Sequence, residues 1–519
     1  MRFVVQQADR TLERRPGTVY LVSSDWDDRS QYETLFNIYY INEAGKTISI
    51  GGTKIGQFGL RPGAANKRRD GYRHPNLPQE FSALGDQYFS LGQDPSFYEA
   101  LTAIGYRFRE EVLTALHDIA YNTALGARAE AEEVTRVSLL RSVPLPTVRG
   151  QFSRLARGGA RLTAYQLSLQ ASTVETSTVE PITLDITVVP DSRPPTNIQV
   201  LIGRNGVGKS TYLNNLTTAL VHGSDQAGND STAIVRDQLS NVVSVSFSAF
   251  DSFEPITVPR DRTMGLTYHY VGLKKPRPRN DEPGQTKDHR ALSHEMTRTA
   301  RSCLEGARRE RWSRALKLLE SDPIFAAAGL SERIDSISVH ADQAEVLQMM
   351  PEIFGNFSSG HKIVLLTVTR LVEAVEEKSL VLLDEPEAHL HPPLLSAFVR
   401  ALSDLLAHRN GIALIATHSP VVLQEVPRSC VWRLSRSGNE VATDRLRLET
   451  FAENVGTLTD EVFGLEVDAT GFHKILADAA ADYSDYDTAL AAFNRQVGTE
   501  GRAMLRAMIN AAGAARVER

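Results

Sequence analysis

The segment 203–210 restricts the fold of this chain more than any other feature. It reads Gly-Arg-Asn-Gly-Val-Gly-Lys-Ser and fits the pattern G-x-x-x-x-G-K-S, whose glycines let backbone N–H groups surround phosphates. Such a loop joins a strand to a helix, because the positive N-terminus of the helix faces the phosphates. The apolar run 198–202 predicts that strand, and the apolar spacing over 211–220 predicts that helix. We therefore expect an α/β protein that binds a nucleoside triphosphate.

The residues of this loop have expected tasks. Lys209 should reach the terminal phosphates as a catalytic cation, and the hydroxyl of Ser210 should ligate Mg²⁺. A chance match to the pattern is the alternative, and the flanking strand and helix argue against it. The expected nucleotide-binding residues here are Gly203, Arg204, Asn205, Gly206, Val207, Gly208, Lys209, Ser210 and Thr211.

Two adjacent carboxylates follow the apolar run 380–383, which shows no alternation and so predicts a central parallel strand. Phosphates bind at the C-terminal ends of such strands. Asp384 is expected to hold Mg²⁺ with Ser210, and Glu385 is expected to orient or deprotonate the attacking water. An ordinary strand and turn is the alternative, and the presence of the phosphate loop disfavours it.

A further buried strand is predicted over 411–416, and it leads into Thr417 and His418. A single histidine in such a place is often a turn residue bonded to backbone. Because this strand follows Asp384 and Glu385 in sequence, we instead expect His418 to contact the γ-phosphate.

The segment 357–361 reads Phe-Ser-Ser-Gly-His and precedes an apolar helix. Ser358, Ser359 and Gly360 should therefore lie at a helix N-terminus, which suits an anion. Taken alone, this pattern is a helix cap.

In their order, these segments resemble the motifs of ABC-type ATPases, and the likeness covers residues 162–435. Ser359 and His361 stand where that family has glycine and glutamine in its signature motif. The resemblance implies ATP and Mg²⁺ as cofactors, ATP hydrolysis, and a homodimer or a larger assembly built from it. In that dimer Ser358, Ser359 and Gly360 of one copy close on ATP held by the loop of the other.

The continuation 386–392, Pro-Glu-Ala-His-Leu-His-Pro, resembles the OLD-like, RecF-like and SMC-like (AAA_21-like) branch rather than transporter ATPases. His389 and His391 could form a metal pair, but a spacing of two without a third ligand favours a subunit contact or a cap. No glutamine follows the strand predicted near 242–247, so Ser248 or Asp251 is the candidate for the family's glutamine position.

The tail segment 451–464 resembles the ATPase subunits of Septu-type and retron-associated anti-phage systems, which partner a separately encoded nuclease. A switch that regulates a nuclease or another effector in phage defence is therefore the expected role. A DNA-repair or DNA-organising ATPase is the alternative, and a transporter subunit is less favoured.

DNA remains a candidate ligand because of three basic runs, 67–69, 274–279 and 308–314. Such runs are more often solvated surface, and the net charge of −6, from 57 basic and 63 acidic residues, excludes an overall basic nucleic-acid sleeve. Two cysteines without a pairing pattern and the absence of a long apolar run predict a soluble, cytoplasmic protein that does not enter a membrane.

The pattern of periodicities predicts an α/β fold with a mixed β core and an inserted helical subdomain, preceded by an α+β extension. The expected divisions are an N-terminal extension 1–160, ATPase core 161–273, inserted loop and helices 274–350, ATPase core 351–436 and a helical region 437–519.

Overall fold

The computed structural model of the chain describes most of its residues. The described ranges are 1–7, 15–24, 31–63, 73–159, 162–173, 181–222, 235–236, 238–246, 255–256, 266–275, 286–304, 307–337, 340–437, 440–469 and 471–517. The expectations for Ser248, Asp251 and the basic segments 67–69 and 276–279 fall outside these ranges.

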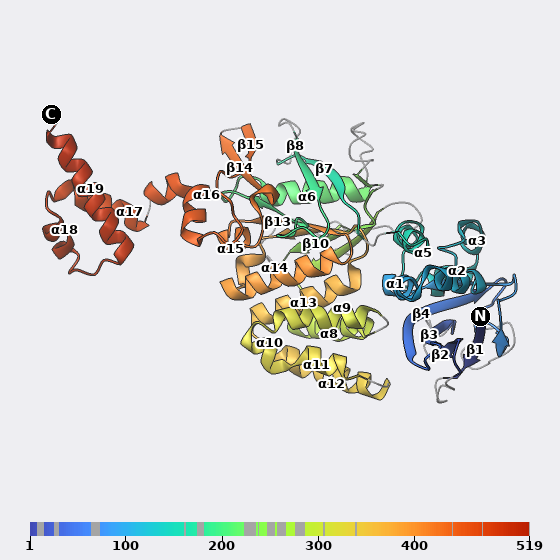
Figure 1. Ribbon diagram of the computed structural model, residues 1–519. Helices are drawn as coiled ribbons and strands as arrows, with labels where there is room; N and C mark the ends of the chain where they lie inside the picture. The colour runs from blue at the N-terminus through green and yellow to red at the C-terminus, as the bar shows by residue number, and fades with distance from the viewer. Residues whose placement is uncertain are drawn as a thin grey trace.

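A seven-stranded sheet forms the centre of the described structure, in the order β11-β10-β12-β13-β9-β14-β15 (Figure 1). All neighbouring pairs are parallel except β14 with β15. Because β12, β13 and β9 are adjacent and parallel, the segments that follow them meet at one edge of the sheet. The strands are β9 (Ile198–Ile202), β10 (Asn241–Ser246), β11 (Thr267–Gly272), β12 (Leu380–Asp384), β13 (Ile412–Thr417), β14 (Val431–Ser437) and β15 (Glu440–Asp444).

An N-terminal unit contains a second sheet, six-stranded over the described residues, in the order β5-β1-β2-β3-β4-β6. Helices α1 and α2 lie over this sheet, α5 packs on these helices, and the unit has its own hydrophobic core (Figure 1). It is linked to the ATPase core by an ion pair of 2.7 Å between Arg154 and Glu377. The elements are β1 (Arg2–Gln6), β2 (Thr18–Ser23), β3 (Leu35–Ile41), β4 (Thr47–Gln57), β5 (Glu80–Phe81), β6 (Tyr88–Gly92), α1 (Pro95–Ile104), α2 (Tyr106–Ala115), α3 (Thr123–Ala129), η1 (Thr135–Leu139), α4 (Leu145–Thr147), η2 (Val148–Phe152) and α5 (Ser153–Ala156).

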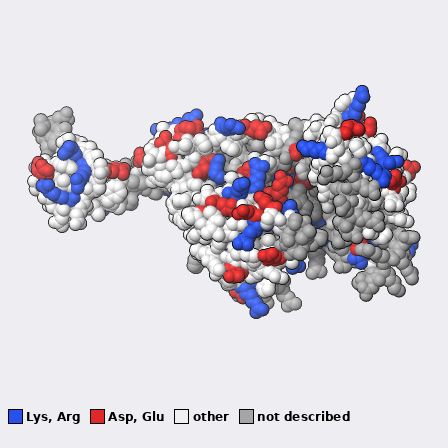
Figure 2. All heavy atoms as spheres, turned by 60° about the horizontal axis from the view of Figure 1, so that its bottom comes forward, with Lys and Arg blue, Asp and Glu red and all other residues white. Residues whose placement is uncertain are grey.

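The C-terminal helices α17 to α19 form a small lobe with a separate core, at the opposite end of the molecule from the N-terminal unit (Figures 1 and 2). The carboxylate of Asp485 caps α18 by accepting from Thr488 N at 2.8 Å. The helices are α16 (Val455–Ala469), α17 (Gly471–Asp482), α18 (Tyr486–Ala492) and α19 (Thr499–Val517).

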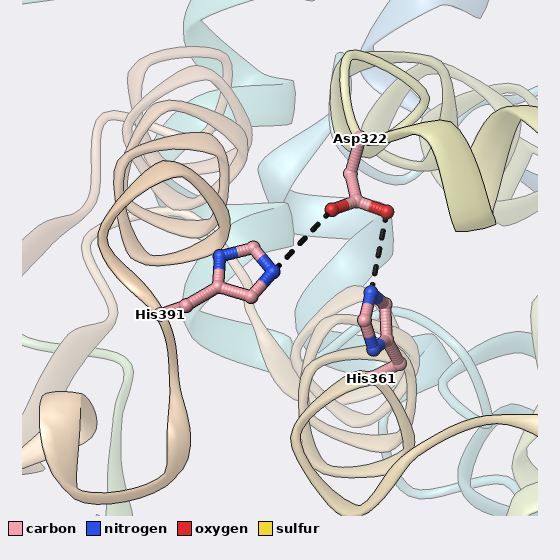
Figure 3. A group of neighbouring side chains, drawn as sticks. All are labelled: Asp322, His361 and His391. Atoms are coloured by element: carbon pink, nitrogen blue, oxygen red, sulfur yellow. Dashed lines mark hydrogen bonds and ion pairs between the residues drawn. The ribbon is translucent and has the colours of Figure 1, made fainter.

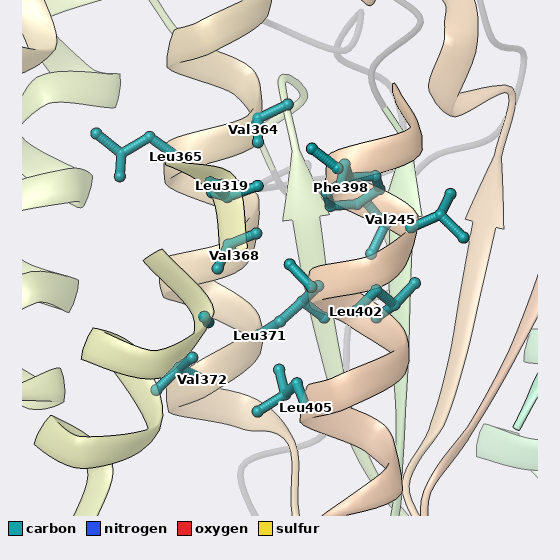
Figure 4. Close-up of a cluster of buried hydrophobic side chains, with 14 of the residues drawn as sticks. Val245, Leu319, Val364, Leu365, Val368, Leu371, Val372, Phe398, Leu402 and Leu405 are labelled. Carbon is teal, nitrogen blue, oxygen red and sulfur yellow. The ribbon is translucent and has the colours of Figure 1, made fainter. Parts of the chain in front are cut away.

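Helices cover both faces of the central sheet, which explains why its strands are apolar without alternation. On one face, α13 and α14 pack on side chains such as Val245, with Leu371 and Leu402 between these helices (Figure 4), and α8 and α9 pack on the side of α13 and α14 that faces away from the sheet. On the other face, α6 and the antiparallel hairpin of β7 and β8 pack on Leu382 and Leu414. The remaining bounds are β7 (Tyr165–Ala171), β8 (Ile182–Val188), α6 (Lys209–His222), α8 (His289–Cys303), α9 (Ala307–Leu319), α10 (Pro323–Ala328), α11 (Leu330–Asp335), α12 (His340–Asn356), α13 (Ser359–Ala374), η3 (Pro386–His389), α14 (Pro392–Ala407), α15 (Pro420–Leu423) and η4 (Arg428–Cys430).

The expected fold class is confirmed, since the chain has a mixed α/β fold with a mainly parallel central sheet and a P-loop between β9 and α6. Within the described ranges, no helix is both long enough and apolar enough to cross a membrane.

Candidate functional site

The phosphate loop follows β9 and has a backbone that requires glycine. Gly206 and Gly208 have φ angles of 75° and 104°, where side chains other than glycine's are strained. A Cβ on Gly208 would also lie 2.5 Å from the carbonyl oxygen of Thr173. The loop therefore presents backbone amides with no side chain in the way at these two positions, as a phosphate cradle requires.

Lys209 begins α6 and is 3% exposed. Its Nζ donates to the carbonyl oxygens of Gly203 at 2.9 Å and Arg204 at 3.0 Å, so the side chain folds back over the loop. Burial lowers the pKa of Lys209, while the carboxylates of Glu385, Asp384 and Glu387 act in the opposite direction. Two carbonyl oxygens thus hold the lysine against the loop, and the three carboxylates favour its charged form.

Ser210 and Asp384 meet although they lie far apart in sequence. The Ser210 hydroxyl donates to Asp384 Oδ1 at 2.9 Å, which joins the start of α6 to the end of β12. A cavity of about 40 Å³ borders both residues, together with Ser244, Ser246 and Tyr270. A hydroxyl and a carboxylate are oxygen ligands of the kind that Mg²⁺ prefers, so this pair fits the expected cation.

Glu385 follows β12 with a positive φ of 44°, and its amide donates to Ala416 O at 2.9 Å. This bond fixes the backbone of Glu385 beside the end of β13. His418 Nδ1 lies 3.8 Å from Glu385 Oε1, and both side chains are more than one third exposed, at 42% and 37%. The expected catalytic carboxylate and the expected γ-phosphate contact are therefore neighbours at an open edge of the sheet.

Glu387 is a site residue that the sequence interpretation missed. Its Oε1 accepts from Thr417 Oγ1 at 2.6 Å and from His418 N at 2.7 Å, and it lies 3.1 Å from His418 Nδ1. The side chain is only 9% exposed. Glu387 thus fixes the backbone of His418 and places a carboxylate oxygen beside its ring nitrogen. The sequence Asp-Glu-Pro-Glu at 384–387 contained a clue to this role. Glu387 lies two residues after Glu385, and its side chain reaches the end of the neighbouring strand β13.

The signature segment lies at the start of α13, as expected. Ser358 is the N-cap and accepts from His361 N at 3.4 Å, while Ser358 and Ser359 are exposed. Gly360 is buried against η3, and a Cβ there would lie 2.6 Å from His389 O. Among the described residues, no hydrogen bond or ion pair links this segment to the loop 203–210 of the same chain.

The basic residues on α9 have structural partners. Arg309 donates to Ile337 O at 3.0 Å, Arg311 lies 3.4 Å from Asp94 of the N-terminal unit, and Arg314 lies 2.9 Å from Asp404. Burial lowers the pKa of Arg311 to about 9, and the Arg409 guanidinium contributes. Figure 2 shows Lys and Arg interspersed with Asp and Glu on the face in view. Arg311 is therefore taken up by the contact between the two units, and Arg314, whose side chain is 53% exposed, shares its surface with Asp404.

A larger cavity of about 770 Å³ lies beside the tip of the phosphate loop. It is bordered by the loop 203–207, by residues 433–436 of β14 and by residues 460–464 of α16. The sequence interpretation treated 451–464 as a resemblance to anti-phage ATPase subunits and did not place this segment or 433–436 beside the phosphate loop. Their position brings the C-terminal region, through α16, to the edge of the nucleotide site.

Comparisons with known proteins found a matching family model, similar solved structures and a relative of nearly equal length. The AAA_21 family, described as "AAA domain, putative AbiEii toxin, Type IV TA system", matches residues 331–424. A nucleotide-free ATP-binding cassette from an ABC transporter is 12% identical and covers 54% of this chain and 90% of its own, with a TM-score of 0.28. An ATP-binding cassette in its ADP conformation is 12% identical and covers 58% and 99%, with a TM-score of 0.29. Because these scores are low, the fold assignment rests on the sheet order and the loop geometry.

A relative from a phage matches nearly the whole chain. Protein ea59 of Escherichia phage lambda is 37% identical over 510 residues, which are 94% of this chain and 94% of the relative. The chain thus belongs to the family of phage lambda protein ea59.

Proposed function

We propose that this protein is a Mg²⁺-dependent ATPase that works as a dimeric nucleotide-driven switch. The observation that carries the proposal is the set of contacts at one edge of the central sheet. Ser210 bonds to Asp384, and Glu385 lies beside His418, which Glu387 holds. These contacts join the ends of β12 and β13 to the start of α6, which is the arrangement that phosphoryl transfer to water requires.

The residues divide the work between binding and catalysis. Lys209 and the amides of 203–211 hold the phosphates, and Ser210 and Asp384 hold Mg²⁺, which supplies charge neutralisation when bound. Glu385 orients or deprotonates the attacking water, and His418 contacts the γ-phosphate. Prearranged donors at an open edge supply the rate increase, so no covalent intermediate with the chain is needed.

The dimeric form is supported by the position of the signature residues. Ser358 and Ser359 are exposed at the N-terminus of α13, and no described contact joins them to the phosphate loop of the same chain. A helix N-terminus attracts an anion. A second copy, placed head to tail, would bring Ser358, Ser359 and Gly360 to the nucleotide held by the first.

The biological role that we propose is control of a separately encoded nuclease or other effector in anti-phage defence. A relative encoded by a phage is compatible with competition between phages. The DNA-repair or DNA-organising alternative has less support, because Arg309, Arg311 and Arg314 are engaged within the chain.

Nucleotide binding and hydrolysis can be tested separately. Lys209→Ala should lose binding of a fluorescent ATP analogue, because the buried cation at the loop is gone. Glu385→Gln should retain binding and lose about 100-fold or more in turnover, because the carboxylate beside the attacking water is neutral. Full hydrolysis by Glu385→Gln would contradict the proposed role of Glu385, and Mg²⁺-dependent binding that survives Lys209→Ala would contradict the site.

A further inference from the structure

Three side chains that the proposed ATPase cycle does not use converge beside the signature segment (Figure 3). Asp322 caps α10, His361 lies in the first turn of α13, and His391 caps α14. His361 Nε2 lies 3.2 Å from Asp322 Oδ1, and His391 Nε2 lies 3.7 Å from Asp322 Oδ2. The ligand atoms of all three lie within 4.8 Å of one another.

We propose that Asp322, His361 and His391 form a binding site for a transition-metal dication of the Zn²⁺ class. Two imidazoles and one carboxylate are the donors that such ions select, and three protein ligands leave a position for water. Two bonds of about 2.0–2.1 Å in a tetrahedral site place their ligand atoms about 3.3 Å apart. The 3.2 Å separation of His361 from Asp322 Oδ1 matches that value, whereas the 3.7 Å separation of His391 is to the other carboxylate oxygen, Oδ2. All three ligand atoms lie within 4.8 Å of one another, so a shift of the exposed His391 side chain toward His361 completes the site.

The three side chains differ in burial, as expected for a metal site that is open on one side. The side chains of His361 and Asp322 are 4% and 7% exposed, whereas that of His391 is 52% exposed. An ion can therefore enter from the side of His391. The rings of Phe325 and Phe357 pack near His361 on the inner side, which keeps water from the buried ligands.

His361 also has the partner that a metal-bound imidazole needs. Its second nitrogen, Nδ1, lies 2.6 Å from Ser358 Oγ. A metal at Nε2 places the proton on Nδ1, which then donates to the serine oxygen and fixes the ring. This arrangement explains why His361 stands where the family has glutamine. Histidine can bind a metal through Nε2 and Ser358 through Nδ1 at the same time, which glutamine cannot do.

Metal binding requires one rearrangement at His391. Without an ion, His391 Nδ1 accepts from Leu394 N at 3.2 Å, so the proton lies on Nε2. Coordination through Nε2 moves the proton to Nδ1 and releases the Leu394 amide, which water can satisfy because His391 is half exposed. One cap hydrogen bond is weak compared with the bonds to a metal, so binding remains favourable.

Occupation of this site changes what Ser358 offers to a nucleotide. When Asp322 accepts from His361 Nε2–H, the Ser358 hydroxyl donates to Nδ1. When a metal holds Nε2, Nδ1–H donates to Ser358 and the serine proton becomes available for a phosphate oxygen. The ion would then favour the closed dimer. This consequence rests on the proposed ATP-bound dimer, whereas the metal site does not.

Direct binding tests the site. The nucleotide-free full-length chain, stripped with chelator, is titrated with Co²⁺ in excess Mg²⁺, and the visible absorption of bound Co²⁺ is followed. We expect saturation at about one ion per chain, displacement by Zn²⁺ and at least tenfold weaker binding by His391→Ala. His389→Ala is the matched control, because this exposed histidine lies two residues away and outside the cluster. Asp384→Asn should also bind Co²⁺ normally, which separates this site from the Mg²⁺ site.

Thermal stability and assembly complete the test. Zn²⁺ should raise the melting temperature of the wild type and of His389→Ala but not of His391→Ala or His361→Gln, since binding to the folded state stabilises it. No saturable Co²⁺ signal, or equal affinity in His391→Ala, would overturn the metal site. If Co²⁺ binds but Zn²⁺ leaves ATP-dependent dimerisation of Glu385→Gln unchanged, the proposed effect of metal binding on Ser358 and on dimer closure is refuted. If Glu385→Gln never dimerises, the proposed dimer fails and the metal site stands on the binding data.

Discussion

At the scale of single residues, three carboxylates of the site lie in different environments. Asp384 is bonded to Ser210, Glu385 is more than one third exposed beside His418, and Glu387 is buried beneath His418. The exposed carboxylate can approach water, while the buried one can only position its neighbours. In the proposed mechanism, the exposed Glu385 acts on water and the buried Glu387 positions its neighbours.

Glu387→Gln tests the positioning role. The amide oxygen can still accept from Thr417 and His418 N, but the negative charge that faces His418 Nδ1 is lost. We expect turnover to fall about 10-fold with unchanged ATP affinity, because the γ-phosphate contact loses its orientation. Steady-state kinetics and nucleotide titration measure the two quantities. Thr417→Val is the control for the hydroxyl contact, and an unaltered turnover in Glu387→Gln would show that His418 needs no anionic partner.

The carboxyl of Glu376 makes stability depend on pH. Burial raises its pKa to about 7, although Arg409, Arg308 and Arg311 act to lower it. The folded chain therefore binds a proton that the unfolded chain releases above its ordinary pKa of 4.5, and wild-type stability falls as pH rises through 4.5 to 7. Relative to Glu376→Gln, the loss should be about 2–3 kcal/mol between pH 5 and pH 8. Denaturant unfolding at both pH values measures it, and parallel pH profiles would refute the assignment.

At the scale of elements, the start of α13 is tied to the segment after β12. Gly360 packs on η3, whose residues follow Glu385 directly, so α13 contacts the segment that follows β12. A shift of one element is therefore transmitted to the other. The contact is backbone against backbone, which leaves no space for a side chain at Gly360.

Gly360→Ala tests this contact. Alanine favours a helix by about 1 kcal/mol over glycine, but its Cβ would lie 2.6 Å from His389 O, and this clash should dominate. We expect a net destabilisation of about 1–3 kcal/mol and a reduced ATPase rate, because α13 must move away from η3. Ser359→Ala is the stability control on the same turn, since Ser359 is exposed. A Gly360→Ala protein more stable than wild type would contradict the close approach.

At the scale of the whole molecule, one chain contains a phosphate loop and an outward-facing signature segment. The N-terminal unit is joined to the ATPase core through Arg154 with Glu377 and Asp94 with Arg311, away from the phosphate loop. The C-terminal lobe is at the far end (Figure 1). This leaves the edge that carries Ser210, Glu385 and His418 as the surface on which a second copy would act.

Sedimentation of Glu385→Gln tests the assembly. With ATP and Mg²⁺ the species should sediment at twice the 57.2 kDa mass of one chain, and without ATP at the mass of one chain. Ser358→Arg is the matched variant, because a bulky cation at the exposed N-cap should block closure while leaving nucleotide binding to the loop intact. A Glu385→Gln protein that stays monomeric with bound ATP would refute the proposed dimer.

The sequence predicted much of the fold around the nucleotide site. The strand at 198–202 and the helix after it were located by apolar spacing, and β12 and β13 by apolar runs. The helix start at Ser358 was also located, since the cap of a helix depends on residues close in sequence. Glu387 was missed because its role depends on Thr417 and His418, which only the sheet order makes its neighbours.

The His391 cluster illustrates the same limit. The sequence offered only His389 as a second metal ligand for His391 and so favoured a subunit contact or a cap. His391 does cap α14, but the structure also places Asp322 and His361 beside it and leaves His389 outside the cluster. Likewise, the arginines of α9 resembled a basic run, and their ion pairs with Asp94 and Asp404 became visible only in the folded chain. The ion-pair partner of a charged residue depends on how the helices pack, so it cannot be identified from the sequence alone.

The sequence by itself determined the α/β fold class, the phosphate loop and the ends of strands where catalytic groups gather, because periodicity and loop chemistry act over a few residues. The tertiary structure decided which distant groups meet, including Ser210 with Asp384, Glu387 with His418, and Asp322 with both histidines. The physical reason is that these meetings depend on the order of strands in the sheet and on helix packing, which bring together residues separated by many positions in the chain.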